Sequence, residues 1–255
     1  KKLPSLGDIY INDAFSCSHR KQASIHKITK YIKESYAGPL LKKEVAAINT
    51  IIKNKKEPVT CIIGGSKIST KIGIIKNLIP KFDNIIIVGG MANNILDYLG
   101  NPIGKSIKED NCKSIIDDIF KTAKTNSCSV IYPEDVVVGK NLDDKAQIKK
   151  LNEVTNDDFI LDIGPKTIDK IKDIIEHSET ILWNGPAGYF ENKHFAKGSY
   201  EIAEKIKKKN INNSIYSVAG GGDTIAVLNQ INAINDFNFV STAGGAFLEY
   251  LEGKE

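Results

Sequence analysis

The sequence predicts an α/β protein whose main domain has three layers, with helices covering both faces of a parallel sheet. Apolar residues make up 41% of the chain and aromatic residues 7%, and Ile and Val prevail among the apolar ones. Buried parallel strands have this composition because both of their faces are covered. From residue 58 onward, short β-branched runs alternate with glycine clusters and helical patterns, as in a parallel sheet with helical crossovers.

A different pattern precedes residue 58. Residues 9–11 predict a short strand and residues 25–32 a helix, which Ala37-Gly38-Pro39 breaks. Residues 40–56 predict an amphipathic helix, because apolar residues at 41, 45, 48 and 52 share one face. Pro58 marks its end. We expect this helix to connect a remnant of a second α/β domain to the main domain.

Six strand-like runs carry the sheet of the main domain. They lie at residues 59–63, 85–88, 129–132, 180–183, 215–218 and 239–240, with a further extended piece at 136–138. We expect helices at residues 68–78 and through Leu99, and further helices after the last two strands. Right-handed crossovers place the carboxyl ends of all the strands at one edge, where open α/β sheets bind ligands.

Five of these strands are followed by glycine-bearing turns, at residues 64–65, 89–90, 185, 220–222 and 244–245. Glycine lets backbone N–H groups approach an anion, and helix N-termini attract it. A single pair of glycines usually marks only a turn that needs positive φ, but five at one edge predict phosphate binding. The P-loop and the dinucleotide fingerprint are absent, which argues against both of those folds by motif.

Three charged residues accompany the turns. Lys67 lies in the first turn and Lys71 four residues later, so both are expected on one face near a helix N-terminus. Cations there oppose the helix dipole and favour a bound anion. Asp223 follows three glycines at a helix start, where it could simply cap the helix. Beside a polyphosphate it predicts a Mg²⁺ ion, which commonly takes one carboxylate plus phosphate oxygens.

The net charge limits the classes of function that the chain can have. The chain carries +4 overall, with 12 Lys/Arg against 5 Asp/Glu in residues 1–57, or +7, and 23 against 26 in the remainder, or −3. The basic segment could attract an anion or form a solvated lysine-rich face. No basic patch is interleaved with aromatic residues, so we expect no nucleic-acid partner.

The four cysteines show neither metal-site nor disulfide spacing, which suits a reducing compartment. With no signal peptide and no long apolar run, we expect a cytoplasmic protein without a membrane partner. The chain begins within a strand-like segment without Met and ends after an apparent helix, which predicts a piece of a longer protein.

Seven sequence blocks, in this order, resemble the phosphoglycerate kinase family. They are GDIYINDAFSCSHR at 7–20, GGSKISTKIG at 64–73, GGM at 89–91, DIGPKT at 162–167, WNGPAGYFE at 183–191, AGGGDT at 219–224 and STAGGAFLEYLEGK at 241–254. The resemblance implies two Rossmann-like domains joined by a helix. Residues 1–36 would be a remnant of the N-terminal substrate domain, 37–57 the interdomain helix and 58–255 the nucleotide-binding domain.

The resemblance also implies a reaction. The enzyme would reversibly transfer a phosphoryl group between 1,3-bisphosphoglycerate and Mg-ADP, giving 3-phosphoglycerate and Mg-ATP in glycolysis. Mg²⁺ would be the cofactor, ATP or ADP the nucleotide, and the protein a monomer. Phosphoryl transfer of this kind depends mostly on positioning and charge neutralisation.

By the same resemblance, individual residues take roles. Lys67, Gly222 and Gly245 would be catalytic, with Gly244 beside Gly245, and Arg20 would bind phosphoglycerate. Asp223 would ligate Mg²⁺. The nucleotide would contact Gly65, Ser66, Lys71, Gly89, Gly90, Ile160, Leu161, Asn184, Pro186, Tyr189, Glu191, Gly221, Gly222, Asp223 and Thr224.

Ile160 and Tyr189 are among the positions that depart from the family's pattern. Ile160 stands where the family usually has a glycine against the adenine, and Tyr189 replaces a smaller aliphatic residue, so both add bulk there. Two alternatives to a complete kinase remain open. The chain as it stands could be a non-catalytic adenine-nucleotide-binding module, or a Rossmann-type NAD-binding protein, against which the missing fingerprint argues.

Overall fold

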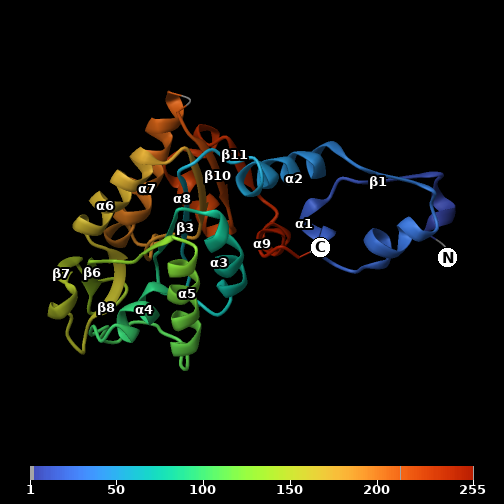
Figure 1. Ribbon diagram of the computed structural model, residues 1–255. Helices are drawn as coiled ribbons and strands as arrows, with labels where there is room; N and C mark the ends of the chain where they lie inside the picture. Colours follow the sequence, from blue (N-terminus) through green and yellow to red (C-terminus); the bar gives the residue numbers. More distant parts are fainter. Residues whose placement is uncertain (1–2, 213, 255) are drawn as a thin grey trace.

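The computed structural model describes residues 3–212 and 214–254 and contains three sheets (Figure 1). The largest has six parallel strands in the order β11-β10-β9-β3-β4-β5. These strands are β3 (Val59–Ile63), β4 (Asn84–Ile87), β5 (Ser129–Ile131), β9 (Thr180–Asn184), β10 (Tyr216–Gly220) and β11 (Phe239–Ser241). The predicted parallel α/β architecture is therefore confirmed.

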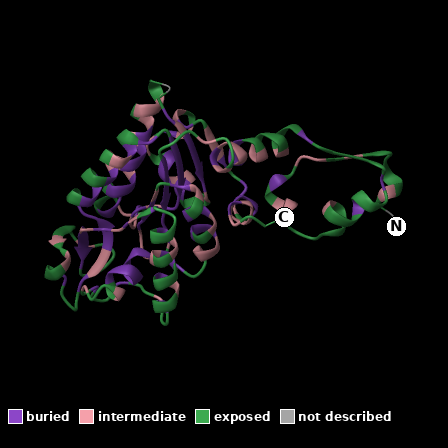
Figure 2. Ribbon diagram, viewed as in Figure 1, coloured by how far each residue is buried: buried purple, intermediate pink, exposed green. Residues whose placement is uncertain are grey.

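Helices cover both faces of this sheet, because successive strand residues point to opposite sides. In β3, Cys61 and Ile63 join one buried cluster and Ile62 joins another. The first cluster contains residues of α3 (Ile72–Leu78), α4 (Ala92–Tyr98), α5 (Lys113–Thr125) and α9 (Gly245–Leu251). The second contains residues of α6 (Pro165–His177), α7 (Lys197–Ile211) and α8 (Gly222–Gln230). Figure 2 shows the resulting buried interior of the three layers.

The register of the six-stranded sheet aligns the ends of its strands. Asn184, the last residue of β9, pairs with Ile63 of β3 and with Gly220 of β10. Ile63 pairs in turn with Ile87, and Gly220 with Ser241. Five strands therefore finish at the same level, and the glycine turns that follow them lie at one edge.

A second sheet was not predicted as such. Strands β6 (Asp135–Gly139), β7 (Gln147–Lys150) and β8 (Phe159–Ile163) pair antiparallel in the order β7-β6-β8. The extended piece at 136–138 thus belongs to this sheet and does not join the parallel one. Four residues of β7 are partly or fully exposed, so no apolar run marks that strand in the sequence.

The N-terminal residues form an arm that projects from the body (Figure 1). Strands β1 (Ile9–Asn12) and β2 (Glu34–Ala37) make a two-stranded parallel sheet, and α1 (Phe15–Ser18) lies between them in the chain. Helix α2 (Pro39–Ile52) joins the arm to β3. Asp13 fixes this junction, because its carboxylate accepts the N–H groups of Leu40 and Leu41 at 2.6 and 3.0 Å, in the first turn of α2.

Three predicted helices differ in the structure. Residues 23–30 form a π-helical turn and a 3₁₀ turn, because the carbonyl of Gln22 accepts N–H groups from three successive residues. Helix α2 ends at Ile52 and does not reach Lys56, whose N–H donates instead to Thr180 Oγ1 at 3.1 Å. The helix predicted from residue 68 begins at Ile72.

Ser69 explains the late start of α3. Its N–H and hydroxyl donate to the two carboxylate oxygens of Glu109 at 2.9 and 2.5 Å. These bonds hold residues 68–71 in a turn before the helix. The argument that Lys67 and Lys71 share one helical face is therefore wrong.

None of the helices in the described part of the chain combines the length and the apolar character needed to span a bilayer. Cys61 is buried in β3.

Candidate functional site

A cavity of about 550 Å³ opens where the carboxyl edge of the six-stranded sheet faces strand β8. This volume lies within the range of small-molecule sites. Its wall has two parts of different chemistry. Glycine turns with Ser66 and Asp223 form one part, and mainly apolar residues of the 103–107 loop and of β8 form the other.

The glycine part depends on close backbone contact between the first turn, at Gly64, and the third, at Gly185. A Cβ at Gly64 would lie 2.2 Å from the Pro186 carbonyl oxygen, and one at Gly185 would lie 2.3 Å from the Gly64 carbonyl oxygen. Gly185 also has a φ of +100°, which side-chain-bearing residues rarely adopt. Gly64 and Gly185 are therefore needed for packing, whereas Gly65 of the first turn and Gly89 of the second line the cavity.

Lys71 lies behind this wall, at the position before the first turn of α3. Its Nζ donates a short hydrogen bond to Asn184 Oδ1, and Asn184 Nδ2 donates to the Gly220 carbonyl oxygen at 2.6 Å. Burial lowers the pKa of Lys71, while the charges of Cys61, Asp223 and Glu252 partly oppose this shift. Lys71 is thus a half-buried cation for which a bound anion would relieve the desolvation.

The turn after β10 presents the beginning of α8 to the cavity. Asp223, in the first turn of α8, is exposed and lines the cavity. Thr224 is buried, and its Oγ1 accepts the Gly185 N–H at 2.7 Å, which joins this turn to the one after β9. A Cβ at Gly222 would meet no atom within 4 Å. Gly222 is therefore not required for packing and leaves the start of the helix open.

The apolar part comes mainly from β8 and from the loop after α4. Ile107, Phe159, Ile160 and Leu161 line it, with Tyr189 from the segment after β9. A flat heterocycle suits such a wall, whereas a phosphate suits the glycine turns. The added bulk of Ile160 and Tyr189 leaves the cavity open.

One buried carboxylate in the wall was not predicted as a site residue. Asp162 of β8 accepts the N–H groups of Gly198 and Ile163 at 2.7 and 2.9 Å. Burial raises its pKa from the ordinary 3.8 to about 7, which these two bonds partly offset. Asp162 thus fixes the start of α7 against β8.

The structure brings together most of the residues that the sequence singled out. Ten of them line the cavity: Gly65, Ser66, Gly89, Gly90, Ile160, Leu161, Pro186, Tyr189, Glu191 and Asp223. Lys71, Asn184 and Thr224 connect the turns behind it through the bonds given above. Gly221 lies between them, since a Cβ there would come within 2.8 Å of Asn184 Nδ2.

Five further predicted residues are not part of the cavity wall: Lys67, Gly222, Gly244, Gly245 and Arg20. Lys67 is exposed in the turn that Glu109 holds. Against the effect of burial, the hydrogen bonds from Ser69 lower the pKa of Glu109, and the charge of Lys67 adds to this. Gly245 begins α9, and the His19 ring lies against it, 3.4 Å from where a Cβ would stand. Arg20, beside His19, is exposed on the arm.

Sequence reasoning missed several wall residues. Ser106, Ile107, Asn141, Leu142 and Phe159 line the cavity but come from loops and from the unpredicted antiparallel sheet. The apolar run 159–161 after Asn156-Asp157-Asp158 is the one signal that could have revealed β8. Within residues 3–212 and 214–254, no cluster of three or more His, Cys, Asp or Glu side chains could hold a metal ion by itself.

Comparison with known proteins identifies relatives along the whole chain. The sequence profile described as "Phosphoglycerate kinase" matches residues 1–254. Proteins of that name from Wolbachia pipientis subsp. Culex pipiens and from Francisella tularensis subsp. novicida are 44% and 41% identical, each over 257 aligned residues and 100% of this chain. The chain spans 65% and 64% of their respective lengths.

Solved structures agree with the sequence relatives. The phosphoglycerate kinase of Coxiella burnetii superposes with a TM-score of 0.94 at 40% identity, covering 99% of this chain and 64% of that one. The enzyme of Pyrococcus horikoshii gives a TM-score of 0.80 at 28% identity, covering 100% and 63%.

Proposed function

The chain belongs to the phosphoglycerate kinase family, and from that premise we propose that it forms the nucleotide-binding part of a kinase that interconverts 1,3-bisphosphoglycerate and ADP with 3-phosphoglycerate and ATP. One observation carries the proposal. The register of the six-stranded sheet brings the glycine turns and Asp223 to a cavity whose wall also includes apolar residues of β8, with Lys71 behind the turns. This arrangement suits a phosphate chain at one end and a base at the other.

The phosphate end acts by charge and by backbone donors. Amides at the turns near Gly65 and Gly222 donate to phosphate oxygens, and Lys71 supplies a half-buried cation. In the forward reaction a terminal ADP oxygen bonds to the transferred phosphorus, and the bond from that phosphorus to the acyl oxygen breaks, leaving a carboxylate. Lys67 and the amides of Gly222 and Gly245 stabilise the negative charge of the phosphoryl group in flight.

Magnesium fits this end when it arrives with the nucleotide. Asp223 is an exposed carboxylate in the wall, beside an open glycine and without a further acidic cluster among the described residues. Mg²⁺ is commonly bound by one carboxylate together with phosphate oxygens and water. Asp223 would hold the ion, which would neutralise phosphate charge when bound.

The base end selects a nucleoside. Ile160 and Leu161 would pack against the adenine, with Tyr189 and Pro186 closing the same wall, and Glu191 would accept hydrogen bonds from the ribose hydroxyls. Asn184 would act at the phosphate end instead, because it bonds both to Lys71 and to the turn after β10.

The acceptor side belongs to the arm. Residues 1–36 would be part of the substrate domain, 37–57 the connecting helix and 58–255 the nucleotide-binding domain. Arg20 would contact phosphoglycerate, and the contact of His19 with Gly245 brings that side to the start of α9. We also propose that the protein is a cytoplasmic monomer.

Calorimetry on the chain tests the proposed function. Titration with Mg-ADP and with NAD should give binding of Mg-ADP at least about tenfold tighter, since the dinucleotide fingerprint is absent. Preferential binding of NAD would instead support the Rossmann dehydrogenase alternative. Absence of nucleotide binding by a folded chain would reject the nucleotide site.

A further inference from the structure

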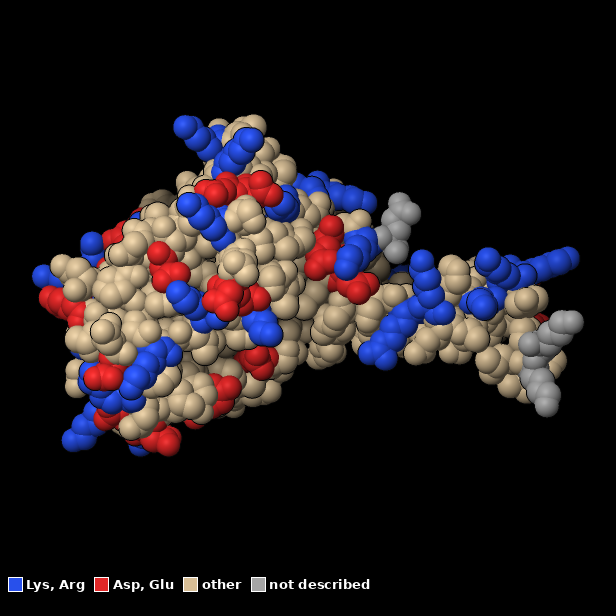
Figure 3. Space-filling view, turned by 90° about the horizontal axis from the view of Figure 1, so that it is seen from below, with Lys and Arg blue, Asp and Glu red and all other residues tan. Residues whose placement is uncertain are grey.

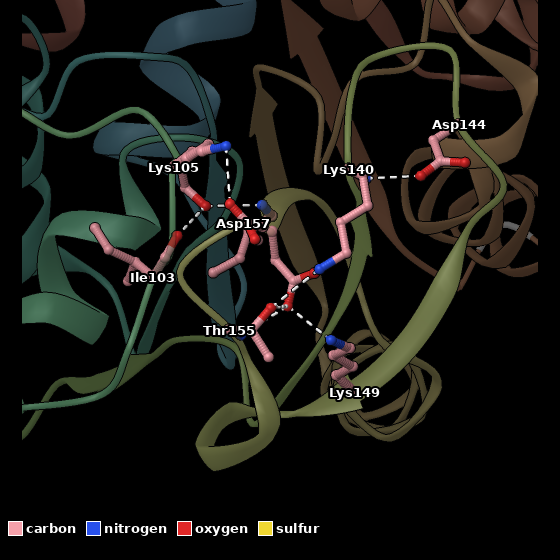
Figure 4. A network of polar contacts seen from close by, with 10 residues as sticks. Ile103, Lys105, Lys140, Asp144, Lys149, Thr155 and Asp157 are labelled. Carbon is pink, nitrogen blue, oxygen red and sulfur yellow. Dashed lines mark hydrogen bonds and ion pairs between the residues drawn. The ribbon is translucent and has the colours of Figure 1, made fainter.

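A buried carboxylate outside the proposed contacts joins three segments around the apolar end of the cavity. Asp158, directly before β8, is fully buried. Lys149 Nζ donates to its Oδ2 at 2.7 Å, and Lys140 Nζ lies 2.9 Å from its Oδ1. The N–H and hydroxyl of Thr155 donate to Oδ2 at 2.6 and 2.9 Å. Figure 4 shows the side chains of Lys140, Lys149 and Thr155 pointing toward one another.

This cluster is costly to build for stability alone. Burial opposes ionisation of Asp158, yet the bonds from Lys149, Lys140 and Thr155 hold its pKa well below the usual range. Buried ion pairs seldom stabilise a fold more than apolar packing would, but they can specify one geometry. The two lysines come from β7 and from the end of β6, so the carboxylate ties both strands to the start of β8.

The backbone of Asp158 holds a fourth segment. Its carbonyl oxygen accepts the Lys105 N–H at 2.7 Å. Gly104 makes this approach possible, because it has a φ of +57° and a Cβ there would lie 2.3 Å from the same carbonyl oxygen. The loop at residues 103–107 is thereby pinned against the start of β8.

The pinned loop builds the cavity wall directly. Ser106 Oγ accepts the Ile160 N–H at 2.7 Å and donates a short bond to the Ile103 carbonyl oxygen. Ser106, Ile107, Phe159 and Ile160 all line the cavity. The side chain of Asp158 itself does not line it, so any effect on a ligand must act through this wall.

We propose that Asp158 is the positioning residue of the base end, holding the 103–107 loop and β8 at the spacing that accepts the nucleotide base. This inference rests on the proposed function, since it requires the base to lie at the apolar end. Different interactions would then hold the two ends of the cavity in place. The sheet register holds the phosphate end, and the ion cluster around Asp158 holds the base end.

The experiment compares Asp158→Asn with Asp157→Asn. Asp157 is the neighbouring carboxylate, but it pairs only at the surface, with Lys105 at 3.0 Å. Both variants and the unaltered chain are titrated with Mg-ADP and with Mg-tripolyphosphate, which lacks a base. In Asp158→Asn we expect the Kd for Mg-ADP to rise about tenfold through lost preorganisation, with the Kd for tripolyphosphate changed less than about twofold. Asp157→Asn should change neither.

Amide hydrogen exchange supplies a readout that needs no ligand. The Ile160 and Lys105 N–H groups should exchange faster in Asp158→Asn and not in Asp157→Asn, because local opening becomes easier. If Asp158→Asn does not fold, Lys149→Gln cuts the 2.7 Å bond without touching the cavity wall, and the same results are expected of it.

Two results would overturn the positioning role. One is an equal loss of affinity for Mg-ADP and for tripolyphosphate, and the other is unchanged exchange at Ile160. A chain that binds tripolyphosphate but not Mg-ADP would contradict the proposed function. Exchange at Ile160 would then decide the positioning role alone, since faster exchange supports it and unchanged exchange rejects it.

Discussion

Strand β1 of the arm and strand β4 of the body both carry isoleucines, but only those of β4 are buried. In the body, Ile85, Ile86 and Ile87 of β4 are each 0% exposed, whereas Ile9 and Ile11 of β1 are 56% and 60% exposed. Parallel strands are normally covered on both faces, and two strands alone are marginally stable. A β-branched run therefore predicts a strand, but its burial depends on which other elements cover it.

Charge follows the same division. Lys and Arg prevail on the projecting arm in the view of Figure 3, whereas both signs are interspersed over the body. This agrees with the +7 net charge of residues 1–57 and the −3 of the remainder. We therefore expect the nucleotide contacts within the body, and the contact proposed for the acceptor, Arg20, on the basic arm.

The largest expected effect concerns turnover. The chain should bind Mg-ADP but transfer phosphate from 1,3-bisphosphoglycerate many orders of magnitude more slowly than an intact kinase. The residue proposed to hold the acceptor, Arg20, is exposed on the arm. Precise positioning of both reactants can account for ~7–11 kcal/mol of an activation barrier, so a poorly held acceptor should slow the transfer greatly. A coupled assay beside calorimetry measures both quantities. Turnover near that of an intact kinase would show that the arm already completes the acceptor site.

Matched isoleucine substitutions test the packing contrast itself. Ile86→Ala should lower the free energy of unfolding by about 2–5 kcal/mol, because it leaves a cavity in a fully buried strand. Ile11→Ala should change it by less than about 0.5 kcal/mol, as for an exposed position. Denaturant unfolding measures both. Similar losses would mean that the arm is packed as well as the body.

The pH dependence of stability should report Asp162. Its folded-state pKa of about 7 lies above the ordinary 3.8. The protonated form therefore favours folding below about pH 4, and this contribution is lost as the pH rises toward 7. Relative to Asp162→Asn, the unaltered chain should lose roughly 2–4 kcal/mol between those pH values. If the stability of the two proteins depends on pH in the same way, the raised pKa does not belong to Asp162.

A smaller effect separates binding from stability at Lys71. Lys71→Met should weaken Mg-ADP binding by about 1.5–3 kcal/mol, the range of a charge-assisted bond. It should leave stability unchanged or higher, because a desolvated cation is removed. Lys76→Met is the matched control, since Lys76 lies in α3 but pairs at the surface with Asp118. Equal affinity in both variants would argue against phosphate contact by Lys71.

Local sequence patterns were enough for the parallel sheet. The run 59–63 became β3 with the same bounds, and glycines after the strands marked the edge where the cavity opens, because buried branched runs and turn residues are local signals. The polar strand Gln147–Lys150 could not be recognised from the sequence. It is a strand because it pairs with β6, and its own residues show no strand pattern. The late start of α3 depends on Glu109, forty residues after Ser69.

The candidate site divides in the same way. The residues of the glycine turns could be named from the sequence, since each turn is marked locally. Asp158 and Ser106 could not, because their roles depend on partners brought together only by folding, Lys140 and Lys149 for the first and Ile160 for the second. No local pattern distinguishes a buried aspartate from a solvated one.

The most direct test of the nucleotide site is its dependence on magnesium through Asp223. Affinity for ADP is measured by calorimetry with and without Mg²⁺, in the unaltered chain and in Asp223→Ala. Mg²⁺ should strengthen binding about tenfold in the unaltered chain and have little effect in the variant. Equal strengthening in both proteins would contradict the assignment of Asp223, and with it the account of the phosphate end.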